Sequence, residues 1–309
     1  MIIYCFIRKI SLTRITREPE KADDWVWIVD HTIQIGAEKC FVILGIRISH
    51  LPCPERCVSH EDIEPIDIIP VRKSDGKIVW KHLENAVEKT GVPRAILGDH
   101  GSDIKAGVVK FCRNHSGTVY LYDIKHKTAS VLKHELENDE AWQKFVQSAA
   151  QTKLKLQQTS LAPLSPPAQR SKSRYMNAGR LVGWGRNILN FFDRDDCKEI
   201  CDEFGWDRNR IDETLGRTLS LRDQIDEWEE VVRIVETTES FVRKNGLYNG
   251  CCRELKEHLP ARTETERAEK VRNELVSFVA EEELKVGSYE RLPGSSEVIE
   301  SVFGKFKRI

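Results

Sequence analysis

Short apolar runs alternate with amphipathic stretches between about residues 25 and 122. The segments WVWIVDHTI (25–33) and KCFVILGIRI (39–48) are apolar and rich in β-branched and aromatic residues, which predicts two consecutive strands. The short connection between them contains Gly36, so the two strands should pair as an antiparallel hairpin. Weaker apolar runs predict three more strands, at 66–71, 95–97 and 118–123.

Two helices are predicted among these strands. Apolar residues recur at helical spacing over 79–87, and Gly91 and Pro93 then supply stop signals. A second helical pattern covers 104–112. The predicted order is strand, strand, strand, helix, strand, helix, strand, which is typical of an α/β layer structure.

The pattern changes beyond about residue 126, where no convincing strand is found. Apolar residues step by three and four over 221–235 and again over 268–278, which predicts amphipathic helices. The segment LAPLSPPAQRSKSR (161–174) is rich in proline, serine and basic residues, so it should be a loop or linker.

Two aspartates occupy positions where an α/β sheet often carries a ligand site. Asp30 lies within the first apolar strand, where a charged side chain is costly unless a partner compensates it. Asp99 follows the 95–97 strand directly, at the carboxyl end where open α/β sheets place ligands. A pair of carboxylates at one sheet edge suits Mg²⁺, which takes one or two protein carboxylates and fills its shell with water and phosphate oxygens.

A third acidic candidate is Glu300, in the segment PGSSEVIESVFGKFK. Pro293 and Gly294 end the preceding segment, a following serine can cap, and Glu297 favours the first turn of a helix. Glu300 would then lie about one turn into this helix. Lys307 comes seven residues later and returns to nearly the same side of the helix.

The segments around these three acids resemble those around the catalytic acids of DDE-type insertion-sequence transposases. The resemblance is carried by WIVDHTIQIGAEKCFVILGI, RAILGDHGSDIKAG and SSEVIESVFGKFK. It implies a ribonuclease H-like α/β fold, in which a mixed five-stranded sheet with flanking helices is interrupted by a mainly α-helical insertion. It further implies that Asp30, Asp99 and Glu300 are catalytic and bind Mg²⁺, with Mn²⁺ as a substitute, and that Lys307 contacts DNA.

The spacing of the three acids sets the expected domains. Asp99 and Glu300 are separated by far more residues than one helix and one strand require, so an insertion is expected between them. The predicted parts are an N-terminal arm (1–23), the first part of the core (24–149), a mainly helical insertion with a basic linker (150–290) and the segment that completes the core (291–309).

Charge is balanced overall but not locally. The chain has 48 basic and 49 acidic residues, yet residues 141–192 contain no Asp or Glu. This basic window predicts contacts with DNA phosphates, and Tyr175 and Trp184, which lie between its basic residues, could stack on bases or be buried in a helix. The candidate DNA-binding residues in it are Arg170, Lys172, Arg174, Arg180, Arg186, Tyr175 and Trp184.

These observations predict a DNA transposase that cleaves element ends and transfers strands by in-line phosphoryl transfer. Its expected partners are double-stranded DNA, at element ends and target, and a second copy of the chain as a homodimer on DNA. No apolar run reaches the roughly 18 residues of a membrane span, and the resemblance implies a bacterial, cytoplasmic, nucleoid-associated protein.

Two alternatives stay open. Little sequence precedes residue 25 and the chain stops shortly after Lys307, which is expected of a truncated DNA-binding remnant or regulator without catalysis. A structure-selective nuclease with the same fold would cleave DNA without joining it.

Overall fold

The computed structural model describes residues 18–35, 38–54, 56–169 and 175–299. It divides into two compact units. Unit 1 falls within Met1–Lys127, Glu239–Leu255 and Val276–Ile309, and unit 2 falls within Thr128–Thr238 and Lys256–Leu275. Unit 1 thus also takes in Glu239–Leu255 and the chain from Val276 to 290, which lie inside the stretch interpreted above as an insertion.

Unit 1 contains a mixed five-stranded sheet with the strand order β3-β2-β1-β4-β5. The hairpin predicted from the sequence is confirmed, since β1 and β2 pair antiparallel from Trp25↔Arg47 to Ile35↔Glu38. Strand β3 pairs antiparallel with β2, whereas β4 and β5 run parallel to β1. The bounds are β1 (Trp25–Ile35), β2 (Glu38–Arg47), β3 (Glu64–Val71), β4 (Ala95–Gly98) and β5 (Val119–Tyr122).

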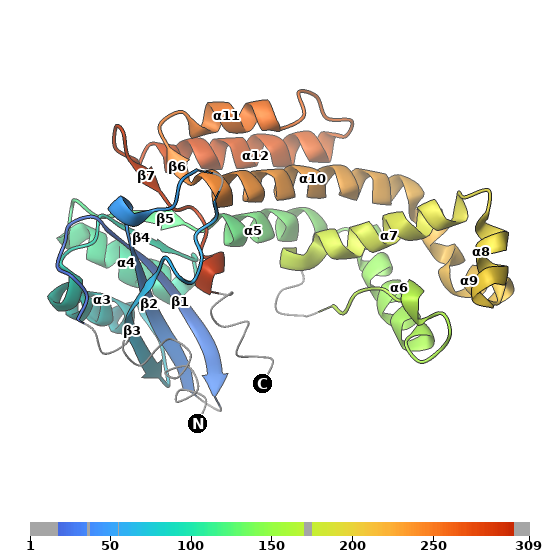
Figure 1. The fold of residues 1–309 in the computed structure, drawn as a ribbon, viewed down its shortest axis with the longest axis horizontal. Coiled ribbons are helices and arrows are strands. Elements are labelled where there is room, and N and C mark those ends of the chain that lie inside the picture. Colours follow the sequence, from blue (N-terminus) through green and yellow to red (C-terminus); the bar gives the residue numbers. More distant parts are fainter. Residues whose placement is uncertain (1–17, 36–37, 55, 170–174, 300–309) are drawn as a thin grey trace. The chain divides into compact units, whose positions relative to one another are not determined.

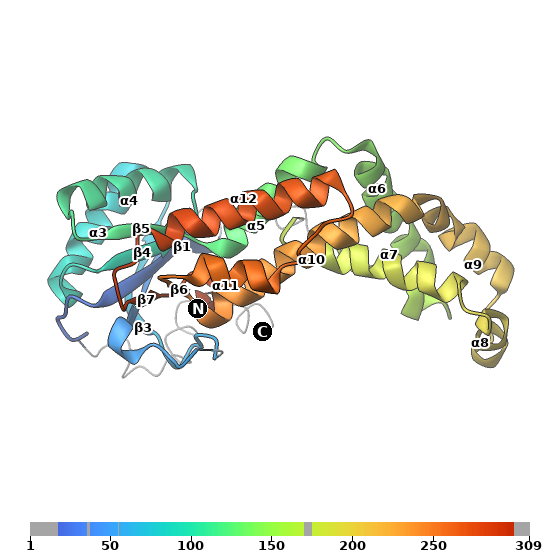
Figure 2. The same cartoon turned by 90° about the horizontal axis from the view of Figure 1, so that it is seen from above.

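Two helices cover one face of this sheet, as Figures 1 and 2 show, and both were predicted. They are α3 (Gly76–Thr90), capped by the Asp75 side chain, and α4 (Ser102–Asn114). Their apolar sides pack on alternate strand residues in a buried core that includes Trp27, Val29 and Ile96. Because successive strand residues point to opposite faces, Asp30 belongs to the other face, with Val26 and Ile28.

The remaining described chain is mainly helical, as predicted. Its α-helices are α5 (Ile124–Leu136), α6 (Glu140–Leu156), α7 (Ala178–Phe192), α8 (Cys197–Phe204), α9 (Arg208–Leu215), α10 (Arg222–Asn245), α11 (Cys251–His258) and α12 (Glu266–Glu283). Short 3₁₀ turns are η1 (Ile48–His50), η2 (Ala162–Leu164), η4 (Tyr175–Asn177) and η5 (Gly216–Leu221).

One part of this region was not predicted. Strands β6 (Leu247–Tyr248) and β7 (Arg291–Leu292) pair antiparallel in unit 1. A strand of two residues is too short to show an alternating pattern, so no period in the sequence could indicate it.

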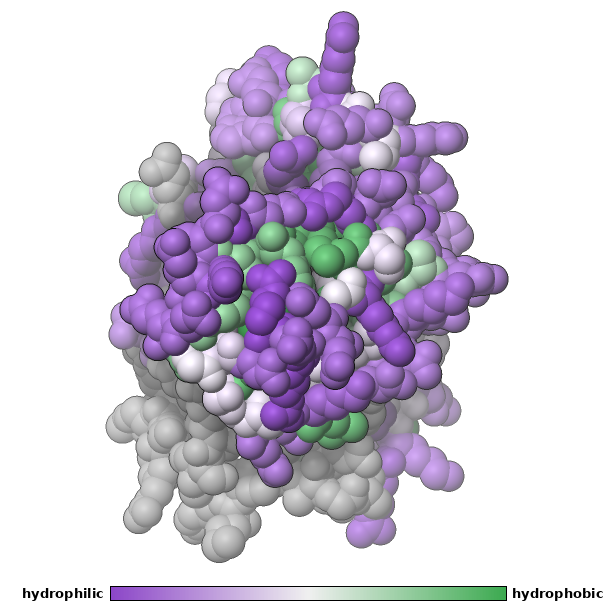
Figure 3. Space-filling view, turned by 90° about the vertical axis from the view of Figure 1, so that its right-hand side faces the viewer, coloured by the Kyte–Doolittle hydropathy of each residue, from purple (hydrophilic) through white to green (hydrophobic). Residues whose placement is uncertain are grey.

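Unit 2 has its own aromatic core. The Trp142 and Trp228 rings meet edge to face with centroids 5.1 Å apart, and the Phe145 and Trp184 rings stack at 5.9 Å. Such pairs add packing energy beyond their buried area. The face of the molecule in Figure 3 is mostly hydrophilic, with apolar side chains gathered near its middle. Within the described ranges, no helix is both long and apolar enough to cross a bilayer.

Candidate acidic site at the carboxyl ends of β1, β4 and β5

The register of the parallel strands brings three aspartates to the same level of the sheet. Val29 pairs with Gly98 on β4, and Gly98 pairs with Tyr122 on β5. The next residue on each strand is an aspartate: Asp30, Asp99 and Asp123. Adjacent strands lie about 4.8 Å apart, so neighbouring residues of this row are close together.

The Asp30 carboxyl group lies in an environment that disfavours its charge. Burial and the negative charge of Asp99 raise the pKa of Asp30 to about 7. Asp123 adds to this effect, while His126 and the backbone N–H of His31 oppose it. A carboxylate with too little positive charge around it attracts cations, so Asp30 and Asp99 form a candidate cation site, called here the acidic edge.

Asp99 is held by a tight turn after β4. Its Oδ1 accepts a hydrogen bond from the Gly101 backbone N–H at 3.1 Å, and its carbonyl oxygen accepts one from the Tyr120 hydroxyl. Gly98 allows β1 to approach, because a Cβ atom at this position would lie 2.9 Å from Val29 Cγ2. The turn therefore fixes Asp99 beside Asp30, in the middle of β1.

Asp123 has a structural role instead. Its side chain is fully buried, and Oδ1 accepts a hydrogen bond from the His126 backbone N–H at 2.9 Å, which caps the first turn of α5. Oδ2 accepts a hydrogen bond from the Ser296 backbone N–H. Both carboxylate oxygens are thus used, and one of them ties the segment before residue 300 to this edge of the sheet.

Two histidines lie near the same edge. The His100 ring stacks on the Tyr122 ring, with centroids 3.7 Å apart and planes within 7° of parallel. Burial, with the nearby charge of Lys105, lowers the pKa of His100 to about 4, so its ring is neutral at pH 7. Electrostatic attraction to His126 partly opposes the rise in the pKa of Asp30.

The described residues do not complete a metal site. No three His, Cys, Asp or Glu side chains within residues 18–299, less the gaps given above, are placed to hold an ion. The predicted third ligand, Glu300, lies outside the described residues, as does Lys307. Two carboxylates, Asp30 and Asp99, are therefore the part of the predicted set that the structure brings together.

The basic window is only partly described, because Arg170, Lys172 and Arg174 lie outside the described residues. Arg180 is exposed, and Tyr175 is half-buried. Arg186 is paired with two carboxylates, since its guanidinium donates to Asp226 and, at 2.8 Å, to Glu229. These pairs balance its charge within unit 2 and weaken its case as a phosphate ligand.

The position of Trp184 does not fit the base-stacking role suggested by the sequence. Its ring is only 9% exposed and packs on Phe145, and its indole N–H donates to the Leu164 carbonyl at 3.0 Å. A ring with this packing has no free face on which a base could stack. Of the two interpretations given above, the buried aromatic helix therefore applies to Trp184.

Comparison with solved structures gives distant likenesses. The structure is similar to the Drosophila P element transposase strand transfer complex, with a TM-score of 0.36 and 11% sequence identity, over 98% of this chain and 78% of that chain. No protein-family model and no curated protein matches the sequence. The mixed five-stranded sheet with flanking helices is itself consistent with a ribonuclease H-like fold.

Proposed function

We propose that this chain is a metal-dependent DNA transposase of the DDE type. The observation that carries the proposal is the acidic edge, where Asp30 and Asp99 follow the paired residues Val29 and Gly98 on adjacent parallel strands. The raised pKa of Asp30 supports a role as a cation ligand, because a bound cation would relieve the repulsion between the two carboxylates.

The chemistry of the donors fits Mg²⁺. Carboxylate oxygens are the hard ligands that this ion prefers, and it commonly takes only one or two of them, leaving positions for water and phosphate oxygens. In the proposal Asp30 and Asp99 hold the ion, and Mn²⁺ can replace it. Such an ion, when bound, would activate the attacking oxygen and stabilise the leaving oxygen.

Glu300 is proposed as the third ligand. Ser296, four residues earlier, is bonded to Asp123, and Asp123 contributes to the electrostatic environment of Asp30. The described start of the final helix includes a hydrogen bond from the Ile299 N–H to the Ser296 carbonyl at 2.8 Å. The chain that leads to Glu300 thus starts from the same sheet edge as the aspartate pair, which supports the proposal.

The proposed reaction has two steps. Water attacks a phosphodiester at the element end, and the P–O bond to the leaving strand breaks to give a free 3′-hydroxyl. That hydroxyl then attacks a phosphodiester of target DNA and displaces a second 3′-oxygen. In the proposal Asp30, Asp99 and Glu300 would hold the cation to which the reacting phosphate binds in both steps. Exposed basic residues such as Arg180, with Arg170, Lys172, Arg174 and Lys307, would bind the DNA backbone.

The test compares wild-type protein with Asp30→Asn and Asp99→Asn on end-sequence DNA with Mg²⁺. Metal ligands support several kcal/mol of transition-state stabilisation, so each variant should nick at least about a hundredfold more slowly. Asp67→Asn is the matched control, because Asp67 lies on edge strand β3 and not at the acidic edge. Its carboxylate forms an ion pair with Lys89 of α3. Equal nicking by all four proteins would remove the proposal.

One observation favours a second candidate, a DNA-binding regulator without catalysis. Among the residues that the structure describes, no group of three side chains is placed to hold a metal ion. Such a regulator would bind DNA with a steep salt dependence and show no metal-dependent cleavage by the wild-type chain. Cleavage without strand transfer would instead indicate a nuclease.

A further inference from the structure

A basic cavity lies in unit 1, on a part of the molecule that the acidic edge does not include. It has a volume of about 450 Å³, within the usual range for ligand pockets. Three separate segments line it: the loop after η1 (51–58), the end of α10 (243–246) and residues 291–298. We call it the basic cavity, because the described residues that line it include four cationic side chains and one anionic side chain.

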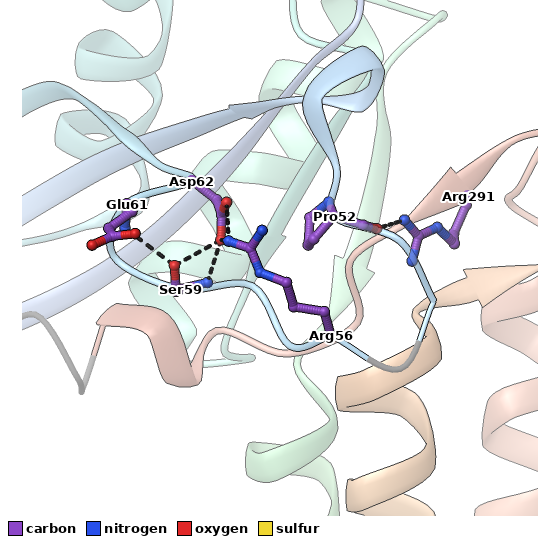
Figure 4. Close-up of polar contacts among 6 residues, drawn as sticks. All are labelled: Pro52, Arg56, Ser59, Glu61, Asp62 and Arg291. Atoms are coloured by element: carbon purple, nitrogen blue, oxygen red, sulfur yellow. Dashed lines mark hydrogen bonds and ion pairs between the residues drawn. The ribbon is translucent and has the colours of Figure 1, made fainter.

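The positive charge in the basic cavity is only partly balanced. Arg243 pairs with Glu297 at 3.0 Å, the one anionic residue in the lining. Arg56 pairs with Asp62, which also accepts hydrogen bonds from Ser59, as Figure 4 shows.

The other two cations have no such partner. The Arg291 guanidinium donates to the Pro52 carbonyl, which is an uncharged acceptor (Figure 4). Lys244 is exposed, and no carboxylate in the described part of the chain pairs with Lys244 or Arg291. An anion is therefore the ligand that this cavity favours, and arginine forks match the oxygens of a phosphate group.

One segment connects the basic cavity to the acidic edge. Gly294 and Ser295 line the cavity. The Gly294 carbonyl accepts a hydrogen bond from the Ile124 N–H at 3.0 Å, and the next residue after Ser295 is bonded to Asp123. Segment 294–296 thus lines the cavity at one end and is bonded to residues that follow β5 at the other, which places the cavity near the acidic edge.

We propose that the basic cavity binds a backbone phosphate of the DNA strand that passes the acidic edge. The choice of DNA as the source of the phosphate rests on the proposed function, whereas the preference for a phosphate group rests on the cavity itself. Lys244 supplies a positive charge that pairs with no carboxylate among the residues the structure describes. Arg243, at 45% side-chain exposure, is accessible to a second anion beside Glu297. Inorganic phosphate and free nucleotides carry the same group and serve as competing probes.

The first experiment measures duplex DNA binding by fluorescence anisotropy at several salt concentrations, in EDTA. The variant is Lys244→Glu, and the matched control is Lys81→Glu, which makes the same charge change at an exposed position of α3. Loss of one phosphate contact should lower the slope of log K against log salt by about 0.9 in Lys244→Glu only. An equal change in both variants would overturn the proposal.

The second experiment uses the wild-type chain and so does not depend on how a variant folds. Cys57 lines the basic cavity and is partly exposed, whereas Cys53 is exposed and outside the lining. Bound duplex DNA should slow alkylation of Cys57 several-fold relative to that of Cys53. Protection by millimolar phosphate or dAMP but not by DNA, or no protection at all, would contradict the DNA assignment.

Both measurements are made without divalent metal, so they are independent of cleavage. A failure of the proposed function would appear as unchanged nicking in Asp30→Asn. A failure of this inference would appear as unchanged salt dependence in Lys244→Glu, or as equal alkylation with and without DNA.

Discussion

Two acidic side chains in unit 1, Asp30 at the acidic edge and Glu283 at the end of α12, show how position decides what a carboxylate does. Glu283 accepts hydrogen bonds from the backbone N–H groups of Gly250 at 2.7 Å and Cys252 at 2.8 Å. Although burial opposes it, these bonds lower the pKa of Glu283. Burial and Asp99 raise the pKa of Asp30 instead. The first carboxylate stabilises the fold, and the second destabilises it when it is charged.

The difference lies in the donors that each carboxylate meets. The Glu283 carboxylate faces the first turn of α11, whose N–H groups have no partners within the helix. Asp30 lies within a strand, where the backbone N–H of His31 only partly offsets its burial, and its neighbours at the same level are two more aspartates. Replacing Glu283 should therefore lower the stability of the fold, whereas replacing Asp30 should raise it at neutral to high pH.

Asp123→Ala should have the largest effect on stability. Asp123 lies at the same level of the sheet as Asp30, but like Glu283 it accepts hydrogen bonds from two backbone N–H groups. Asp123→Ala leaves the buried N–H groups of His126 and Ser296 without an acceptor. We expect the free energy of unfolding to fall by about 3 kcal/mol. Urea denaturation measures this, and a loss below about 0.5 kcal/mol would contradict the assigned role.

Glu283→Ala should have the next largest effect. Removing the acceptor of two backbone N–H groups should lower the free energy of unfolding by about 2 kcal/mol at pH 7. Because the pKa of Glu283 is lowered in the folded state, this contribution is present above the unfolded value and is lost as the pH falls through the folded value. Denaturation at pH 7 and pH 3 should show a smaller loss at the lower pH.

Asp30→Asn should change stability in the opposite direction. Between pH 3.8 and about 7 the folded chain holds a proton on Asp30 that the unfolded chain has released, so stability falls as pH rises across this window. Asparagine does not titrate. Without metal, the variant should be more stable than wild type by on the order of 2 kcal/mol at pH 8 and similar to it at pH 4. If Asp30→Asn were less stable than wild type at pH 8, the destabilising role assigned to the charged Asp30 would be contradicted.

The sequence predicted the sheet of unit 1 well because its strands are long apolar runs with clear breaks. The 25–33 and 39–48 segments became β1 and β2, each within two residues of the predicted ends. Asp30 and Asp99 were found because a carboxylate within or just after an apolar strand is unusual. Their closeness needed the parallel register of β1 and β4, which a sequence pattern does not contain.

Other features could not be predicted from the sequence, because they depend on contacts between segments that are far apart in the chain. Asp123 is visible in the sequence as a cap before α5, but its bond to Ser296 joins residues 173 positions apart. The basic cavity is likewise invisible in the charge pattern, since its four cations come from three segments far apart in the chain. Conversely, the basic window predicted a DNA-binding role for Trp184 that its packing on Phe145 does not support.

The central claim is that Asp30 and Asp99 together bind a divalent cation, and Mn²⁺ binding followed by electron paramagnetic resonance tests it most directly. At pH 8, wild type and Asp67→Asn should bind Mn²⁺ with equal affinity, and Asp30→Asn and Asp99→Asn should each lose at least about tenfold. Equal affinity in all four proteins, or no saturable binding by wild type, would contradict the account.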